Sequence, residues 1–215
     1  EISYKKNYKK FISSFINNIN DRKIFFISKK KIKFSNGFTG STPISVSEIN
    51  KFDIIHLHWI NNGFFNLEKI NNINVPIVWT IRDMWPFTGG CHYTLGCKKF
   101  YSECKLCPSI NNLFFKDDSI LNLFNKKISI FKNQNLHLVG ISKWIEKEIK
   151  NSLISKNNKI HQIYNCIDDD LFFPEKLSKA RENLKLPQNK FIILIGSQKL
   201  NDKLKNNEKI FESVS

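Results

Sequence analysis

One stretch, residues 79–108, holds most of the side chains whose types and spacing could do chemistry. It contains an Arg-Asp pair, a Gly-Gly pair, His92 and four of the five cysteines of the chain. It begins where a β-branched run at 75–78 ends. Loops that leave the carboxyl ends of strands are where α/β proteins bind ligands, and ordinary connections are shorter and more polar. We therefore interpret this stretch as a loop that binds a ligand, or as a loop cross-linked through its cysteines that covers a binding site.

The cysteines of this stretch have the residue type and the number that a structural zinc ion needs. Zinc takes four donors in a tetrahedron, and the Cys-x-x-Cys at 104–107 is a natural half-site. The other two cysteines are spaced more widely than a usual pair, so two disulfides or four ordinary thiols are alternatives. The four cysteines are Cys91, Cys97, Cys104 and Cys107.

Other polar residues follow the predicted strands, where they could contact a ligand. His58 and Trp59 stand at the carboxyl end of one strand, and Asp83 follows the next strand directly. We expect the neighbouring Arg82 to hold Asp83 ionised, either in a ligand site or in a salt bridge that anchors the loop.

The elements that would position these residues alternate between strands and helices. Ser142 is placed to cap a helix, because its hydroxyl can accept an unpaired backbone N–H. Asn165 and Asp168 flank a turn after a strand, where they could cap the next helix or line an interdomain cleft. The alternation predicts βαβ units and a mostly parallel sheet, which is the α/β class. We expect strands at 24–27, 52–58, 75–80, 136–141, 159–164 and 191–195, and helices at 64–70, 113–131, 142–150 and 174–186.

The composition suits one large domain, or one domain and part of a second. The 215 residues are 41% hydrophobic, and the net charge of +15 favours an anionic partner, unless it reflects a general bias towards lysine. An apolar stripe at 4–19 with lysines beside it predicts a helix that packs on the core or docks on anionic lipid. No apolar run reaches the roughly 18 residues of a membrane span, and no secretory signal is visible. One cysteine of the five has no possible partner within a fully paired set, and no secretory signal is visible. Both features favour a protein of the reducing cytoplasm.

A set of short motifs, taken in order, resembles one family. The chain reads His-Leu-His-Trp-Ile at 56–60, Pro-Ile-Val-Trp-Thr-Ile-Arg-Asp-Met-Trp-Pro-Phe-Thr-Gly-Gly-Cys-His-Tyr at 76–93, Cys-x-x-Cys-Pro at 104–108, Ser-Lys-Trp at 142–144 and Ile-Tyr-Asn-Cys-Ile-Asp at 163–168. Together these motifs resemble bacterial glycosyltransferases of family 4, and most closely the enzymes of colanic-acid-type exopolysaccharide assembly.

The resemblance implies a GT-B fold, in which two Rossmann-like domains face a cleft. Residues 1–172 would form the acceptor-side domain, without its first strand, and residues 173–215 a linker and the truncated start of a nucleotide-sugar-binding domain. The implied activity is retaining transfer of a sugar from a nucleotide-sugar to a saccharide or lipid-linked acceptor in surface polysaccharide biosynthesis. That chemistry needs no metal or other cofactor, and such enzymes work in the cytoplasm or at the inner face of the membrane. We expect the chain, as a fragment, to be inactive by itself.

The resemblance also implies roles for particular residues. Asp83 and His92 would be catalytic, and Gly196 and Lys205 would bind the donor. The acceptor-side cleft would be lined by His58, Trp59, Arg82, Gly89, Gly90, Ser142, Asn165 and Asp168.

Two departures from the family pattern keep other functions open. Arg82 stands where many relatives carry His, and Leu204 stands where a phosphate-binding Arg is expected. A non-catalytic glycosyltransferase-like subunit is therefore one alternative. A basic, zinc-stapled nucleic-acid-binding protein is another. The single Cys-x-x-Cys and the scattered lysines disfavour it, so nucleic acid is not the expected partner.

Overall fold

The computed structural model describes residues 33–40, 42, 44–61, 63–110, 117–134, 136–196 and 206–214 of the chain. The helix predicted along 4–19, the strand predicted at 24–27, Leu204 and the donor-binding candidate Lys205 lie outside these residues. The chain divides into two compact units, Glu1–Asn165 and Cys166–Ser215.

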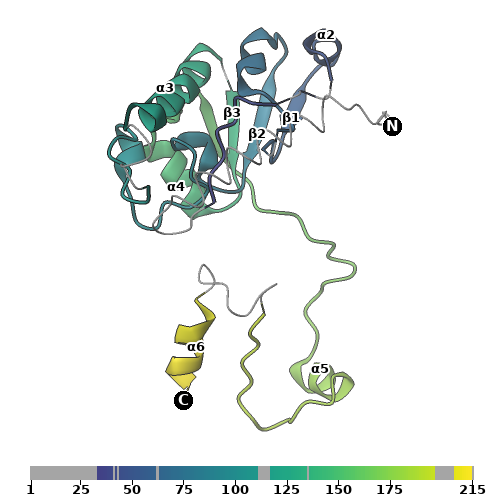
Figure 1. Cartoon of the computed structure of the whole chain (residues 1–215). Helices are drawn as coiled ribbons and strands as arrows, with labels where there is room; N and C mark the ends of the chain where they lie inside the picture. The colour runs from purple at the N-terminus through teal and green to yellow at the C-terminus, as the bar shows by residue number, and fades with distance from the viewer. Residues whose placement is uncertain are drawn as a thin grey trace. The chain divides into compact units, whose positions relative to one another are not determined.

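A four-stranded parallel sheet forms the centre of the first unit (Figure 1). Ile77 in the second strand is in register with Ile55 of the first strand and with Leu136 of the third. Because every pairing is parallel, the carboxyl ends of all four strands lie along one edge of the sheet. This confirms the predicted α/β class with a Rossmann-like parallel sheet. The strands, in their order across the sheet, are β1 (Ile55–Leu57), β2 (Ile77–Ile81), β3 (Leu136–Gly140) and β4 (Lys159–Gln162).

Burial explains why β2 and β3 are the central strands. Both are largely apolar and buried along almost their whole length, as strands covered on both faces are. The edge strand β4 alternates between exposed and half-buried residues. β1 at the other edge is shorter than the strand predicted at 52–58, since Phe52 and Ile54 are exposed and only Ile55–Leu57 pair with β2.

Helices supply the apolar partners of this sheet. Phe131 of α3 stacks on Trp79 of β2 with a centroid distance of 5.4 Å. Ser142 caps α4 as predicted, because its Oγ accepts the backbone N–H of Ile145 at 3.2 Å. No described helix of the chain is both long and apolar enough to cross a membrane. The described helices of the first unit are α2 (Val46–Ile49), α3 (Asp117–Asn133) and α4 (Lys143–Asn151), with the 3-10 helices η1 (Leu67–Asn72), η2 (Trp85–Phe87), η3 (Lys99–Tyr101) and η4 (Leu153–Ser155).

The helix predicted at 64–70 is instead the short 3-10 helix η1. Phe64 donates its backbone N–H to the Asn61 carbonyl at 3.2 Å, so the chain is still turning at this point. Asn66 then caps η1 by accepting the backbone N–H of Glu68 at 2.9 Å. The cap sets where the helix begins, at Leu67, three residues later than the apolar pattern suggested.

The second unit contains α5 (Leu177–Asn183) and α6 (Asn207–Val214) among its described residues. The strand predicted at 191–195 is wrong: the segment is irregular, and Phe191 and Leu194 are 92% and 94% exposed. A parallel strand needs neighbouring strands for its hydrogen bonds, and the described part of 166–215 provides none. That residues 173–215 begin a second Rossmann-like domain therefore stays a prediction.

Candidate functional site

A small pocket lies at the carboxyl ends of β1 and β2, with a volume of about 10 Å³. Four of the predicted site residues line it: His58 and Trp59 follow β1, and Arg82 and Asp83 follow β2. Parallel neighbouring strands end at the same edge of a sheet, and this brings the two sequence segments together. The edge is also where α/β proteins bind their ligands.

Asp83 is held in one orientation by two hydrogen bonds within its loop. Its Oδ2 lies 2.6 Å from His92 Nδ1, and its Oδ1 accepts the backbone N–H of Trp85 at 3.0 Å. The other ring nitrogen of His92, Nε2, lies 3.0 Å from Ser35 Oγ. Because His92 is only 1% exposed, its ring joins Asp83 to Ser35 inside the protein.

The protonation of His92 follows from its burial. Burial lowers the pKa of His92 and outweighs the hydrogen bond and charge of Asp83, which act in the opposite direction. A carboxylate can only accept, so the neutral ring carries its proton on Nδ1, and Nε2 accepts from the Ser35 hydroxyl. Both ring nitrogens are therefore occupied. The ring of His92 thereby orients Asp83, and the prediction that His92 is catalytic stays a prediction.

Arg82 and Asp83 are adjacent in sequence but have different partners. Arg82 is exposed, and its Nη1 donates at 2.9 Å to Oδ1 of Asn165, which follows β4. The prediction that Arg82 is the partner of Asp83 is wrong, because His92 and Trp85 occupy the carboxylate. Arg82 is exposed, whereas Asp83 lies in the bend after β2 and is half-buried, so the two groups meet different partners.

Two histidines lie near the end of β1, and one of them, His58, lines the pocket. His56 Nε2 lies 2.8 Å from Thr80 Oγ1 and so links β1 to β2. The ring of His58 lies on that of His56 at a centroid distance of 4.3 Å. Burial lowers the pKa of His58, and the charges of His56 and Arg82 act in the same direction. His58 is therefore neutral at pH 7 and can both donate and accept hydrogen bonds, beside the 40% exposed Trp59.

Asn61 is a lining residue that sequence reasoning missed. It is 4% exposed, and its Oδ1 is buried without a hydrogen-bond partner. A buried polar atom without a partner costs free energy unless a ligand or water satisfies it, so Oδ1 is suited to accept a bond from a bound molecule. Its position directly after the His-Leu-His-Trp-Ile motif was the available signal. Thr80 and Ser35 were missed as well, and Ser35 lies too far away in sequence to have given a signal.

The other predicted site residues of the first unit do not line this pocket. Ser142 uses its hydroxyl as the cap of α4. Asp168 belongs to the second unit, where its Oδ1 accepts a backbone N–H three residues ahead at 3.2 Å. Gly196 stands in open surroundings. Gly89 and Gly90 lie in the cysteine loop, where a Cβ at Gly90 would come within 2.2 Å of Phe34.

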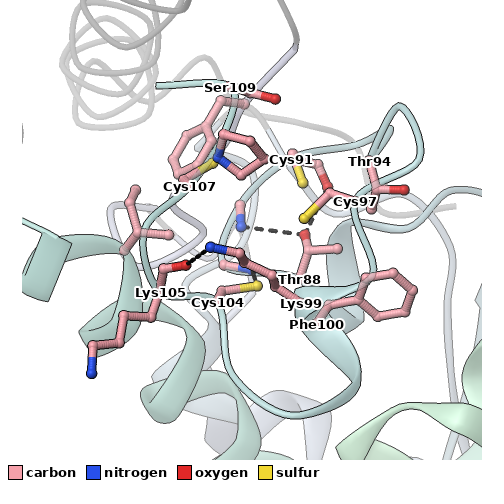
Figure 2. A pocket seen from close by; sticks show the side chains of 15 residues that line it. Thr88, Cys91, Thr94, Cys97, Lys99, Phe100, Cys104, Lys105, Cys107 and Ser109 are labelled. Atoms are coloured by element: carbon pink, nitrogen blue, oxygen red, sulfur yellow. Dashed lines mark hydrogen bonds between the residues drawn. The ribbon is translucent and has the colours of Figure 1, made fainter. Parts of the chain in front are cut away.

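A second and larger pocket, of about 30 Å³, lies within the cysteine loop (Figure 2). All four predicted zinc ligands line it, and all are free thiols. Among the described residues, no three His, Cys, Asp or Glu side chains are already arranged to hold a metal ion. Burial raises the pKa of the Cys91 and Cys104 thiols to about 12. Both are therefore neutral thiols at pH 7 when no metal is bound.

The fold and the first pocket define an α/β protein with a polar site at the carboxyl edge of a parallel sheet. No protein-family model matches the chain, and no solved structure matches it significantly. A protein of Escherichia coli (strain K12), provisionally named as the colanic acid biosynthesis glycosyl transferase WcaC, is 37% identical over 65 residues. The match covers 28% of this chain and only 16% of the length of that protein. The chain is therefore similar to a short part of a protein named as a glycosyltransferase.

Proposed function

We propose that this chain is the acceptor-side part of a retaining glycosyltransferase of surface polysaccharide biosynthesis. It would move a sugar from a nucleotide-sugar to a saccharide or lipid-linked acceptor. The partial similarity to a colanic acid glycosyltransferase supports the class. The observation that carries the proposal is the pocket at the ends of β1 and β2, where an oriented carboxylate, an exposed guanidinium and a neutral histidine stand together.

Arg82 is the group that would stabilise the leaving diphosphate. A guanidinium is always charged and presents several donors in a rigid plane, which suits phosphate oxygens. One of its nitrogens is held by Asn165 at 2.9 Å, and the side chain is otherwise exposed. Preorganised positive groups aimed at developing charge are often the largest contribution to catalysis, so Arg82 has the most important role in this proposal.

The acceptor hydroxyls would meet the groups on the other side of the pocket. Asp83 is oriented by His92 and can accept a bond from a hydroxyl at its partly exposed edge. The neutral His58 and the unpartnered Oδ1 of Asn61 offer further polar contacts. Trp59 exposes an aromatic ring against which the apolar face of a sugar could pack.

The donor would be held by a second domain, with Gly196 and Lys205 among its contacts. Enzymes of the GT-B type close two domains over their substrates, which aligns them and excludes water. The transfer itself would need no metal, as the motif resemblance implies. We place the enzyme in the cytoplasm, at the inner face of the membrane, where lipid-linked acceptors are found.

The proposal is tested by a sugar-transfer assay with a panel of nucleotide-sugars and of saccharide and lipid-linked acceptors. The assay uses this chain and, in parallel, the longest reading frame that contains it. Variants Arg82→Ala and Asp83→Asn are compared with Lys147→Ala, an exposed change on α4. We expect transfer by the longer protein and little transfer by the chain alone. In the longer protein, Arg82→Ala should lower kcat by about 100-fold or more while the variant stays folded.

Each other outcome has a definite meaning. Turnover by the chain alone would contradict the two-domain argument. Acceptor binding without transfer from any nucleotide-sugar would overturn the enzyme proposal in favour of a non-catalytic subunit. Salt-sensitive binding to any DNA sequence, with no binding of saccharides, would favour the nucleic-acid-binding alternative.

A further inference from the structure

The cysteine loop, residues 88–110, brings four thiols to one cavity that the proposed sugar transfer does not use. Figure 2 shows the four sulfur atoms around this cavity. All four cysteines line this one cavity, although they come from different parts of the loop. Four thiols around one cavity are an unusual arrangement for side chains with only a packing role.

We propose that this loop is a structural zinc site in which Cys91, Cys97, Cys104 and Cys107 are the four ligands. Four Zn–S bonds form as four S–H bonds break, and four protons leave to solvent. Nothing is oxidised or reduced. A Zn–S bond is about 2.3 Å long, so four sulfurs close around one ion in a tetrahedron.

Binding of the ion needs the sulfurs to move inward, because no three of the described ligand-type side chains are arranged around a metal position. The cavity that the four cysteines line has a volume of about 30 Å³. Four cysteines are the ligand set of a structural zinc site, which takes a single ion in a tetrahedron.

The loop already contains a donor that a set of thiolates can use. Gly89 donates its backbone N–H to Cys104 Sγ at 3.2 Å. Such an N–H···S bond stabilises the negative charge that zinc binding leaves on sulfur. Ile110 donates its backbone N–H to the Cys107 carbonyl at 3.3 Å, which closes the turn after the Cys-x-x-Cys.

Two lysines supply the positive charge that would offset a zinc ion with four thiolates. Lys127 is buried beneath the loop, where its Nζ donates to the carbonyls of Trp85 and Thr88 at 2.8 and 3.1 Å. Lys99 donates to the carbonyls of Lys105 and Leu106 at 3.0 and 2.8 Å and so fastens the turn of the Cys-x-x-Cys. One Zn²⁺ with four thiolates carries a net charge of −2, and this negative charge would be costly so close to the core without the lysines.

The loop also needs a stabilising cross-link, because it has little apolar core of its own. The small cluster beneath it contains Phe34, Ile110 and Ile120 as buried residues, with three of the cysteines packed against them. Cys91 pairs with Phe34 in an antiparallel bridge and precedes His92 directly. A zinc ion on Cys91 would therefore fix the segment that carries the ring bonded to Asp83, and the site would support the pocket without taking part in its chemistry.

The test uses the complete chain, without an affinity tag, purified in reducing buffer with no chelator. We expect about one zinc per chain by elemental analysis. The variant with Cys104→Ser and Cys107→Ser should lose the metal. The matched control is Cys166→Ser, which changes the exposed cysteine outside the loop and should keep the metal. Replacement of zinc by cobalt should give the visible absorption of a tetrahedral cobalt–thiolate site.

A second measurement keeps the proposal testable if the double variant fails to fold. In the zinc-bound wild-type chain only Cys166 should react with a thiol reagent, and a chelator should release the ion and expose all five cysteines. A folded, freshly reduced chain with less than about 0.2 zinc per molecule would overturn the proposal. So would two disulfides found by mass spectrometry, or stoichiometric iron in place of zinc.

Discussion

The carboxylate of Asp83 is bonded to the buried ring of His92, with 2.6 Å between Oδ2 and Nδ1, and not to the guanidinium of its neighbour Arg82. The pair lies in the loop after β2, and it leaves Arg82 free to reach towards the end of β4. An anionic group and a cationic group are thus held apart at one edge of the sheet. Because of that separation, the carboxylate can accept a hydrogen bond from a hydroxyl while the guanidinium donates to a phosphate.

Removal of the Asp83 carboxylate should destabilise the protein. Asp83→Ala leaves the buried Nδ1–H of His92 and the backbone N–H of Trp85 without their acceptor. We expect the free energy of unfolding to fall by about 2–3 kcal/mol, as for other charge-assisted hydrogen bonds. The measurement is urea denaturation, with the exposed Asp53→Ala as control. Equal stability of the two variants would show that the pair contributes nothing.

Lys127 should be essential to the loop although it is a lysine in the core. Its Nζ bonds two carbonyls and lies 3.9 Å from the centroid of the Trp85 ring. Lys127→Met keeps most of the volume and removes the donors, so we expect a loss of about 2–4 kcal/mol in unfolding free energy. Lys126→Met, at the neighbouring exposed position, should change it by less than about 0.5 kcal/mol. Similar thermal midpoints for the two variants would contradict this role.

Replacement of Asn61 should weaken acceptor binding without lowering the stability of the protein. Asn61→Leu removes a buried oxygen that has no partner, so the folded state loses no hydrogen bond through Oδ1. We expect unfolding free energy to stay equal or to rise by up to about 1 kcal/mol, while the KM for the acceptor increases. Acceptor titrations and denaturation curves of the longest reading frame provide both quantities. An unchanged KM would remove Asn61 from the site.

Arg82 should be replaceable by His but not by Ala. The motif resemblance implies a His at this position in related enzymes, so Arg82→His should retain transfer within about tenfold of the parent. Arg82→Ala should lose about 100-fold or more in kcat. Because Arg82 is exposed, neither change should move the unfolding free energy by more than about 0.5 kcal/mol. Equal kcat values for the Ala variant and the parent would exclude a role for Arg82 in charge stabilisation.

The charge of +15 predicts attraction to anionic membranes. We expect the chain to bind phosphatidylserine-containing vesicles at low salt and to release as salt screens the attraction. Sedimentation with vesicles at increasing salt measures this, with neutral phosphatidylcholine vesicles as the control. Binding to both vesicle types alike would show that charge is not the cause.

The sequence by itself determined the class of fold, because apolar β-branched runs alternating with helical patterns can bury their faces only in a layered α/β sheet. It also located the cap at Ser142, since capping is a local interaction. The cysteine loop and four of the residues that line the first pocket could be found in the same way, because strand ends in a parallel sheet share one edge. Local signals were sufficient for these features.

Only the tertiary structure decided which groups become partners. His92 replaced Arg82 as the partner of Asp83 because backbone direction separates neighbours and burial brings distant residues together. Ser35 joined that network from far away in the sequence, and Asn61 became an orphaned acceptor only once packing had buried it. The apolar run at 191–195 is not a strand because a strand depends on hydrogen bonds from neighbouring strands. Such partnerships depend on three-dimensional proximity, which sequence spacing does not encode.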